Sequence, residues 1–329
     1  MIRIELYADV VCAWAYIGKR RVEAALREWD GGEAEVVWRP FRIDPMAPAE
    51  AQPLAEVLQD PLVDAALQQC APGLSAAENR LRVSEIAAAE GLGPGWGARW
   101  RASSHDAHRL ISLAYDAGGA VLQDAVAEGV LRAHFVEGRD ISLAATLEEV
   151  AAATGFADGG RLLSEGGAEQ AVREMLLRGK AIGVTTSPTL VVAGQALVGA
   201  QAPGAIAEFL AGAAGAGARE LPAEVERFRQ AEALLDKGDP LGCLTLVRPL
   251  AEAHGGDPNV RLLTARAYFH SAQLNRARAL LEALVADAPD DAYARLMLGR
   301  TLERQGLADE AAPHLRVAGA MVPSYGKSS

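Results

Sequence analysis

The segment that most constrains the fold is a strand, a sharp turn and a helix at the start of the chain. An apolar strand over residues 2–7 leads into the turn Asp9-Val10-Val11-Cys12, and a helix with one apolar face follows to Trp29. A second apolar strand occupies residues 34–41. The order strand, helix, strand predicts a parallel pair joined by a right-handed crossover, and therefore an α/β fold.

Cys12 lies at the turn, at or just before the first helical residue. The free backbone N–H groups of a helix N-terminus favour an anion, so this position predicts a lowered thiol pKa and a nucleophilic thiolate. The alternative is that a lone cysteine is simply a small apolar residue. The turn position favours the reactive thiol.

The residues around this turn resemble the active site of DsbA-like thioredoxin-fold proteins, specifically the FrnE-like branch. That branch reads Cys-Pro-Trp-Cys, whereas this chain reads Cys12-Ala13-Trp14-Ala15. The second cysteine is therefore absent. In a dithiol site the second thiol attacks the mixed disulfide and releases the enzyme, which a single thiol cannot do alone.

Further motifs extend the resemblance over residues 1–212, and they occur in the family's order: Arg39-Pro40-Phe41, Ala107-His108-Arg109-Leu110, Ser187-Pro188-Thr189 and Gly199-Ala200-Gln201. The resemblance implies a thioredoxin-like α/β domain with a helical insertion at about 49–165, after which a helix over 171–182 and two short strands around Gly194 complete the domain. A last helix is expected over 206–210.

The resemblance also assigns roles to individual residues. It implies a cis peptide bond before Pro188, facing Cys12, with Ser187, Pro188 and Thr189 holding a bound peptide or thiol by backbone pairing. Trp14 would flank the thiol and limit access to it. His108 would pack beneath the substrate cleft, and these residues complete the candidate site.

A second domain follows a small-residue linker at 213–222. Beyond the linker, similar residues recur every 34 positions, as in Ala231, Ala265 and Gly299, and turn positions keep the same step at Gly238, Ala272 and Gly306. This period is typical of tetratricopeptide repeats and predicts three helix pairs over 223–325. Such repeats bind protein segments; the alternative is a helical cap that stabilises or dimerises the first domain.

Composition narrows the function further. The net charge of −11 argues against nucleic acid or an anionic membrane as a general partner. The chain shows no apolar run long enough for a membrane span and no secretory signal pattern, so we expect a cytoplasmic protein. The histidines show no metal-ligand spacing, and the three widely spaced cysteines form no disulfide framework. Cys243 falls on a core position of the repeats, while Cys70 is either buried or a distant resolving thiol.

Three functions remain open. The first is a monothiol oxidoreductase or isomerase that acts on a protein or peptide substrate and is released by glutathione or another small thiol, with no covalently bound cofactor. The second is a transferase or isomerase like the kappa-class glutathione transferases and hydroxychromene carboxylate isomerases, whose site needs no second cysteine. The third is a redox-inactive co-chaperone. The oligomeric state stays open.

Overall fold

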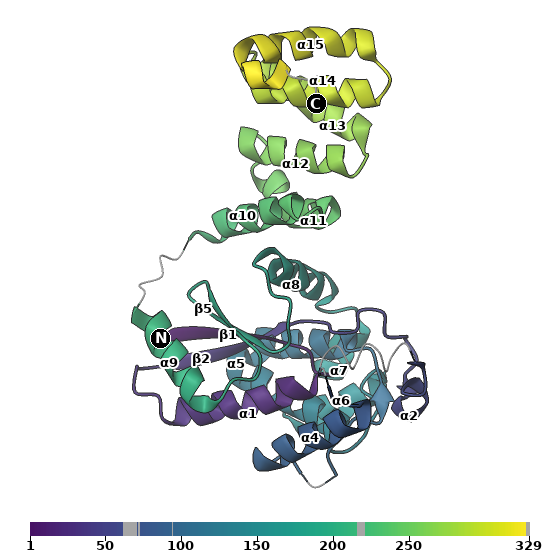
Figure 1. The fold of residues 1–329 in the computed structure, drawn as a ribbon, viewed down its shortest axis with the longest axis vertical. Helices are drawn as coiled ribbons and strands as arrows, with labels where there is room; N and C mark the ends of the chain where they lie inside the picture. Colours follow the sequence, from purple (N-terminus) through teal and green to yellow (C-terminus); the bar gives the residue numbers. More distant parts are fainter. Residues whose placement is uncertain (62–70, 72, 94, 216–220, 327–329) are drawn as a thin grey trace. The chain divides into compact units, whose positions relative to one another are not determined.

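The computed structural model describes residues 1–61, 71, 73–93, 95–215 and 221–326. The chain divides into two compact units, which are described separately (Figure 1). The first comprises Met1–Gly179 and Val184–Arg219, and the second comprises Lys180–Gly183 and Glu220–Ser329. The predicted fold class, a thioredoxin-like α/β domain followed by a helical repeat domain, is confirmed.

A four-stranded sheet forms the centre of the first unit, in the order β2-β1-β5-β6. Its strands are β1 (Ile2–Ala8), β2 (Ala34–Pro40), β5 (Thr189–Val192) and β6 (Gln195–Val198). Strands β1 and β2 are parallel, as the crossover argument predicted, whereas β5 is antiparallel to both β1 and β6. The β5–β6 turn has positive φ at Ala193 and Gly194, which suits a tight hairpin.

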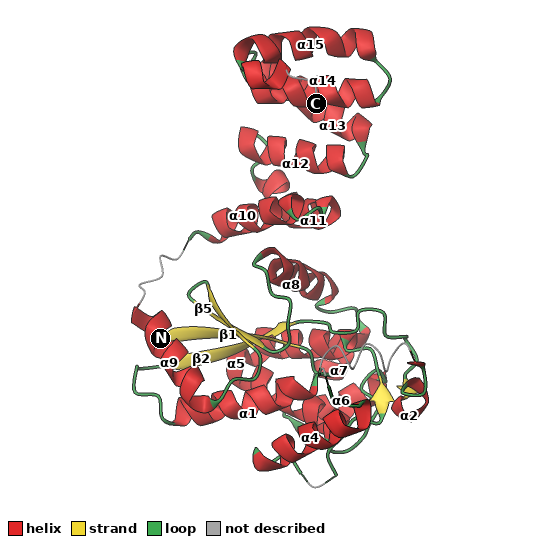
Figure 2. Cartoon of the chain, in the orientation of Figure 1, coloured by secondary structure: helices red, strands yellow, loops and turns green. Residues whose placement is uncertain are grey.

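Helices cover both faces of this sheet (Figure 2). Helix α1 (Ala13–Arg27) packs beside α9 (Pro203–Gly215), and α8 (Glu169–Ala181) lies on the opposite face (Figure 1). Helix α9 continues past the predicted end at residue 210, because Ala213 is still buried in the domain core.

The insertion is less helical than the sequence predicted. It contains α2 (Leu54–Val57), α4 (Ala76–Ala89), α5 (His105–Phe135), α6 (Ala144–Ala153) and α7 (Gly159–Ser164), but also a short antiparallel pair formed by β3 (Gln52–Pro53) and β4 (Trp100–Arg101). Glycines at 91, 93, 95 and 97 separate α4 from β4, and three of them, at 91, 95 and 97, have positive φ. A run of glycines with left-handed backbone ends the helix, which explains the difference.

The edge strand β2 is protected by one side chain of α5. The Gln123 amide accepts a hydrogen bond from the Trp38 N–H at 2.9 Å and donates one to the Trp38 carbonyl at 3.1 Å. Gln123 is buried, so its amide replaces the neighbouring strand that an edge lacks.

Replacing Gln123 by alanine should lower the free energy of unfolding by about 2–3 kcal/mol, because it leaves buried backbone groups of Trp38 unpaired. Urea unfolding followed by tryptophan fluorescence reports this unit alone, since all five tryptophans lie in it. The exposed Gln170→Ala variant is the matched control and should change stability by less than about 0.5 kcal/mol. Equal effects in the two variants would contradict the edge-protecting role.

The second unit consists of consecutive helix pairs. They are α10 (Ala223–Asp236), α11 (Pro240–Ala253), α12 (Pro258–His270), α13 (Leu274–Asp287), α14 (Ala292–Arg304) and α15 (Ala308–Met321), followed by a 3₁₀ turn, η1 (Pro323–Gly326). The recurring turn residues Gly238, Ala272 and Gly306 all have positive φ and join the two helices of each pair. The small recurring residues allow close helix contact: a Cβ on Gly299 would lie 2.6 Å from the Leu315 side chain.

Candidate active site

Cys12 is the N-cap residue of α1, directly after the turn that leaves β1. Its backbone is extended, with φ −91° and ψ 117°, and its N–H donates to the Asp9 carbonyl at 2.9 Å. The Cys12 carbonyl accepts a hydrogen bond from the Ala15 N–H at 2.9 Å, at the start of the helix. The sequence therefore placed the thiol correctly at a helix N-terminus. Cys12 is nevertheless only 8% exposed.

The loop before β5 lies against this thiol. The Ser187–Pro188 peptide bond is cis, and the Cys12 thiol donates to the Ser187 carbonyl with an S···O distance of 3.5 Å. The Ser187 hydroxyl accepts from the Asp9 N–H at 2.9 Å, which joins this loop to the cysteine turn. Helix α1 approaches so closely that a Cβ on Gly18 would lie 2.9 Å from the Pro188 ring. Glycine at position 18 thus permits the contact.

Thr189, the third predicted site residue of this loop, lies inside the domain. It is the first residue of β5, its side chain is 1% exposed, and its hydroxyl donates to the Thr186 carbonyl at 2.7 Å. Its backbone pairs in register with Tyr7 and Val198. The Thr189 side chain is therefore buried and stabilises the loop by its hydrogen bond to Thr186.

Beneath Cys12 lies a buried pair that includes one residue the sequence reasoning missed. His108 is buried, as predicted, and its Nε2 lies 2.9 Å from the Phe41 carbonyl and 3.3 Å from Asp9 Oδ1. Because a carbonyl only accepts, Nε2 carries the proton. Asp9 is 0% exposed and also accepts from the Ile43 N–H at 2.6 Å. The sequence signal for this buried pair was Asp9 itself, an acidic residue within an otherwise apolar turn.

The expected lowering of the Cys12 pKa is wrong in this structure. Burial raises the pKa of Cys12 above its ordinary value, and the nearby Asp9 carboxylate adds to the rise. The Ser187 side chain and the backbone N–H groups of Ala15 and Trp14 act in the opposite direction, as a helix N-terminus should, but burial outweighs them. The sequence shows the helix N-terminus but not the burial.

The raised pKa predicts a distinctive pH profile for alkylation of Cys12. With Cys70 and Cys243 replaced by alanine, the rate should keep rising through pH 9, with a midpoint above the value of about 8.5 for a free thiol. The reason is that the thiolate is the reacting species and burial disfavours it. Iodoacetamide labelling followed by mass spectrometry measures this, and a midpoint near pH 7 would contradict the burial argument.

Trp14 is the second residue of α1 and packs against the domain core, and α4 of the insertion contacts its ring. Trp14 is half-buried, and the Arg82 guanidinium of α4 lies 6.0 Å from the centre of its ring. The insertion thus contacts α1 two residues after Cys12. Of the predicted site residues, Ser187 lies against the Cys12 thiol, Pro188 lies beside Gly18 of α1, and His108 is joined to this group through Asp9.

A second buried histidine, His134 on α5, was not predicted as a site residue. It is 1% exposed, and its Nδ1 has no hydrogen-bond partner among the described residues. Burial lowers the pKa of His134 to about 4, while Asp9 and Asp140 oppose the shift. The imidazole is therefore neutral at physiological pH.

Stability should fall on acidification because of His134. Its folded pKa lies below the unfolded value of about 6.5, so the unfolded state binds the proton first. Stability is fully present above pH 6.5 and decreases toward pH 4, by on the order of 3 kcal/mol. Urea unfolding at pH 7 and pH 4.5 should show this loss in the natural protein and a smaller one in His134→Phe; equal losses would exclude His134 as the cause.

The position of the second family cysteine is occupied by Ala15, which is 0% exposed. Cys70, considered above as a distant resolving thiol, lies outside the described residues. Cys243 is a free thiol at 0% exposure in the repeats, where burial raises its pKa to about 12. Cys243 is thus a core residue, as predicted.

Within the described ranges, no group of three or more histidine, cysteine or acidic side chains is arranged to hold a metal ion. Over the same ranges, none of the helices combines the length and apolar character that a membrane crossing requires.

Comparison with known proteins agrees with this geometry. The family model for the DSBA-like thioredoxin domain matches residues 3–211, and a tetratricopeptide repeat model matches residues 224–300. A crystal structure of a probable DsbA oxidoreductase from Streptomyces coelicolor is similar, with 26% identity and a TM-score of 0.57 over 68% of this chain and 94% of that chain. The search of curated proteins found no match. The chain belongs to the DSBA-like thioredoxin domain family and continues into tetratricopeptide repeats.

Proposed function

We propose that this protein performs thiol–disulfide exchange through the single thiol of Cys12, and that its repeats bind a protein partner. The observation that carries the proposal is the position of Cys12, at the N-terminus of α1 and against the Ser187 carbonyl, with Ala15 where the second cysteine would lie. The motifs around Cys12 and Pro40 favour the FrnE-like branch of the family.

The exchange proceeds in two steps, formation of a mixed disulfide and release of Cys12 from it. The Cys12 thiolate attacks one sulfur of a disulfide, forms a mixed disulfide and releases the other sulfur as a thiolate. An external thiol, such as glutathione in a cytoplasmic pool, then attacks the mixed disulfide and regenerates Cys12. Pairing of a peptide backbone with Ser187 would hold the substrate during both steps, since the backbones of Pro188 and Thr189 already pair within the domain.

The raised pKa of Cys12 should slow the second step, the release of Cys12 from the mixed disulfide. A thiol of high pKa is a poor leaving group, so an external thiol that attacks the partner's sulfur expels Cys12 only slowly. With Ala15 in place of a resolving cysteine, no neighbouring thiol in α1 accelerates the release. We therefore expect a long-lived mixed disulfide, suited to isomerisation, deglutathionylation or capture of a partner.

The test is to mix the full-length protein with a scrambled disulfide-bonded model protein, such as ribonuclease, at pH 8. Non-reducing electrophoresis should show disulfide-linked complexes, and added reduced glutathione should remove them. Absence of linked complexes, with the model disulfides accessible to a dithiol control enzyme, would contradict the proposal. Glutathione conjugation to an electrophile without linked complexes would instead favour the kappa-class type of reaction.

One observation favours a second candidate, a redox-inactive binding protein. The Cys12 thiol is buried and donates a hydrogen bond to the Ser187 carbonyl, an arrangement that also suits an unreactive thiol. In that case a Cys12→Ala variant would suppress aggregation of a client protein as well as the natural chain does. Loss of suppression in the variant would favour the exchange function.

A further inference from the structure

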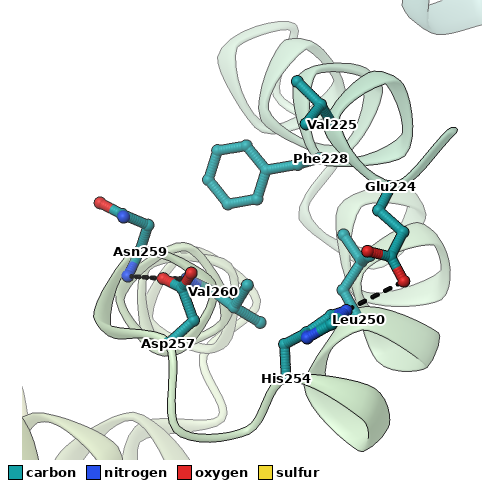
Figure 3. Close-up of a pocket in the computed structure, with 8 residues that line it drawn as sticks. All are labelled: Glu224, Val225, Phe228, Leu250, His254, Asp257, Asn259 and Val260. Atoms are coloured by element: carbon teal, nitrogen blue, oxygen red, sulfur yellow. Dashed lines mark hydrogen bonds and ion pairs between the residues drawn. The ribbon is translucent and has the colours of Figure 1, made fainter. Parts of the chain in front are cut away.

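The second unit contains a pocket of about 330 Å³ where the first helix pair meets the second. Buried Leu250 and Val260 and half-buried Phe228 provide its apolar wall. In Figure 3 the Phe228 ring and the Val260 side chain lie along the same space, with His254 on its other side. The Val225 side chain, 41% exposed, belongs to the same lining.

At the next junction along the repeats, a larger side chain takes the place of Asn259. A step of 34 residues takes Asn259 to Tyr293, and it takes Leu250 and Val260 to Leu284 and Ala294. Tyr293 packs on the cluster that contains Leu284 and Ala294, so an aromatic side chain covers this apolar surface. At the first junction the shorter Asn259 stands at this position and belongs to the lining of the pocket.

The rim of the pocket carries negative charge. Glu224 Oε1 lies 2.9 Å from His254 Nε2, and Asp257 Oδ1 accepts from the Asn259 N–H at 2.7 Å (Figure 3). Both carboxylates are exposed, and the described lining contains no lysine or arginine. An apolar wall beneath two carboxylates matches a side chain with an apolar stem and a cationic end.

We propose that this pocket binds an arginine side chain of a protein partner; the inference rests on the proposed function and specifies its partner. The methylene stem would lie against Val225 and the Phe228 ring, and the guanidinium would pair with Glu224 and Asp257. Arginine suits the site better than lysine because its planar group both stacks on an aromatic ring and forms forked hydrogen bonds to carboxylates.

The test uses the full-length protein and a fluorescein-labelled peptide, Gly-Leu-Arg-Leu-Gly amide, in anisotropy titrations at low salt. A second peptide replaces arginine by citrulline, which has a similar shape without the charge. The arginine peptide should bind at least about tenfold more tightly, and its affinity should fall as salt is added. Equal affinity for the two peptides, or no binding of either, would overturn the proposal.

Two variants locate the binding. Asn259→Tyr introduces the residue that the chain itself uses at the next junction, and it should eliminate binding. Glu224→Gln, at an exposed side chain that leaves the fold intact, should weaken binding by about fivefold. Unchanged affinity in both variants would place binding elsewhere.

Binding of the arginine peptide should be independent of the thiol chemistry of Cys12. The Asn259→Tyr variant should form the Cys12 mixed disulfide at the natural rate, and Cys12→Ser should bind the arginine peptide normally. Failure of peptide binding with intact disulfide exchange would reject the arginine pocket alone. Failure of exchange with intact peptide binding would reject the proposed function of Cys12 alone.

Discussion

Replacing Cys12 by serine is expected to abolish disulfide-linked complexes, with a loss of more than about 100-fold, because a hydroxyl does not attack a disulfide at neutral pH. The fold should be retained, since serine is close to cysteine in size and can donate to the Ser187 carbonyl as the thiol does. Quantification of complexes on non-reducing gels, with partner identification by mass spectrometry, measures the effect.

The control for this prediction is Cys243→Ser. Cys243 is fully buried in the repeats and far along the chain from the turn, so its replacement should leave the complexes at the natural level. Complexes that persist in Cys12→Ser and disappear in Cys243→Ser would assign the chemistry to the wrong domain and reject the account.

Replacing Ala15 by cysteine is expected to convert the site into a dithiol. Residue 15 lies one helical turn after Cys12, the spacing of the family's cysteine pair, so a thiol there can attack a mixed disulfide on Cys12. Turnover in insulin reduction with glutathione should rise by about tenfold or more, and trapped complexes should become scarce. Because Ala15 is fully buried, the added sulfur should lower stability by about 1 kcal/mol.

A matched variant separates the effect of position from that of an extra thiol. Ala25 is also buried on α1, but it lies several turns from the active site. Ala25→Cys should therefore leave insulin turnover unchanged. If Ala15→Cys turned over no faster than Ala25→Cys, absence of the resolving cysteine would not be what limits this protein.

The sequence predicted those parts of the fold that are determined by local pattern. The strand, turn and helix around Cys12 follow from apolar periodicity, and the repeats follow from a strict 34-residue step with small residues at helix contacts. The β3–β4 pair escaped prediction because two-residue strands have no periodicity to detect. Its pairing depends on contacts between residues far apart in the sequence.

The electrostatics of the site could not be predicted in the same way. Cys12 was correctly placed at a helix N-terminus, but its pKa depends on burial by the loop at Ser187, which the turn sequence does not reveal. The role of Asp9 likewise depends on His108 and Ile43, from separate segments of the chain. Sequence pattern places a residue on an element, whereas its chemistry depends on what the fold brings around it.

The most direct test of a single-thiol mechanism is the release kinetics of glutathione from Cys12. The protein is loaded with glutathione disulfide, and the adduct is followed by intact-protein mass spectrometry as reduced glutathione is added. The account predicts one adduct, on Cys12, that persists without added thiol and is released at a rate proportional to the thiol concentration. Release at a rate independent of added thiol would reveal a resolving thiol within the chain and contradict the account.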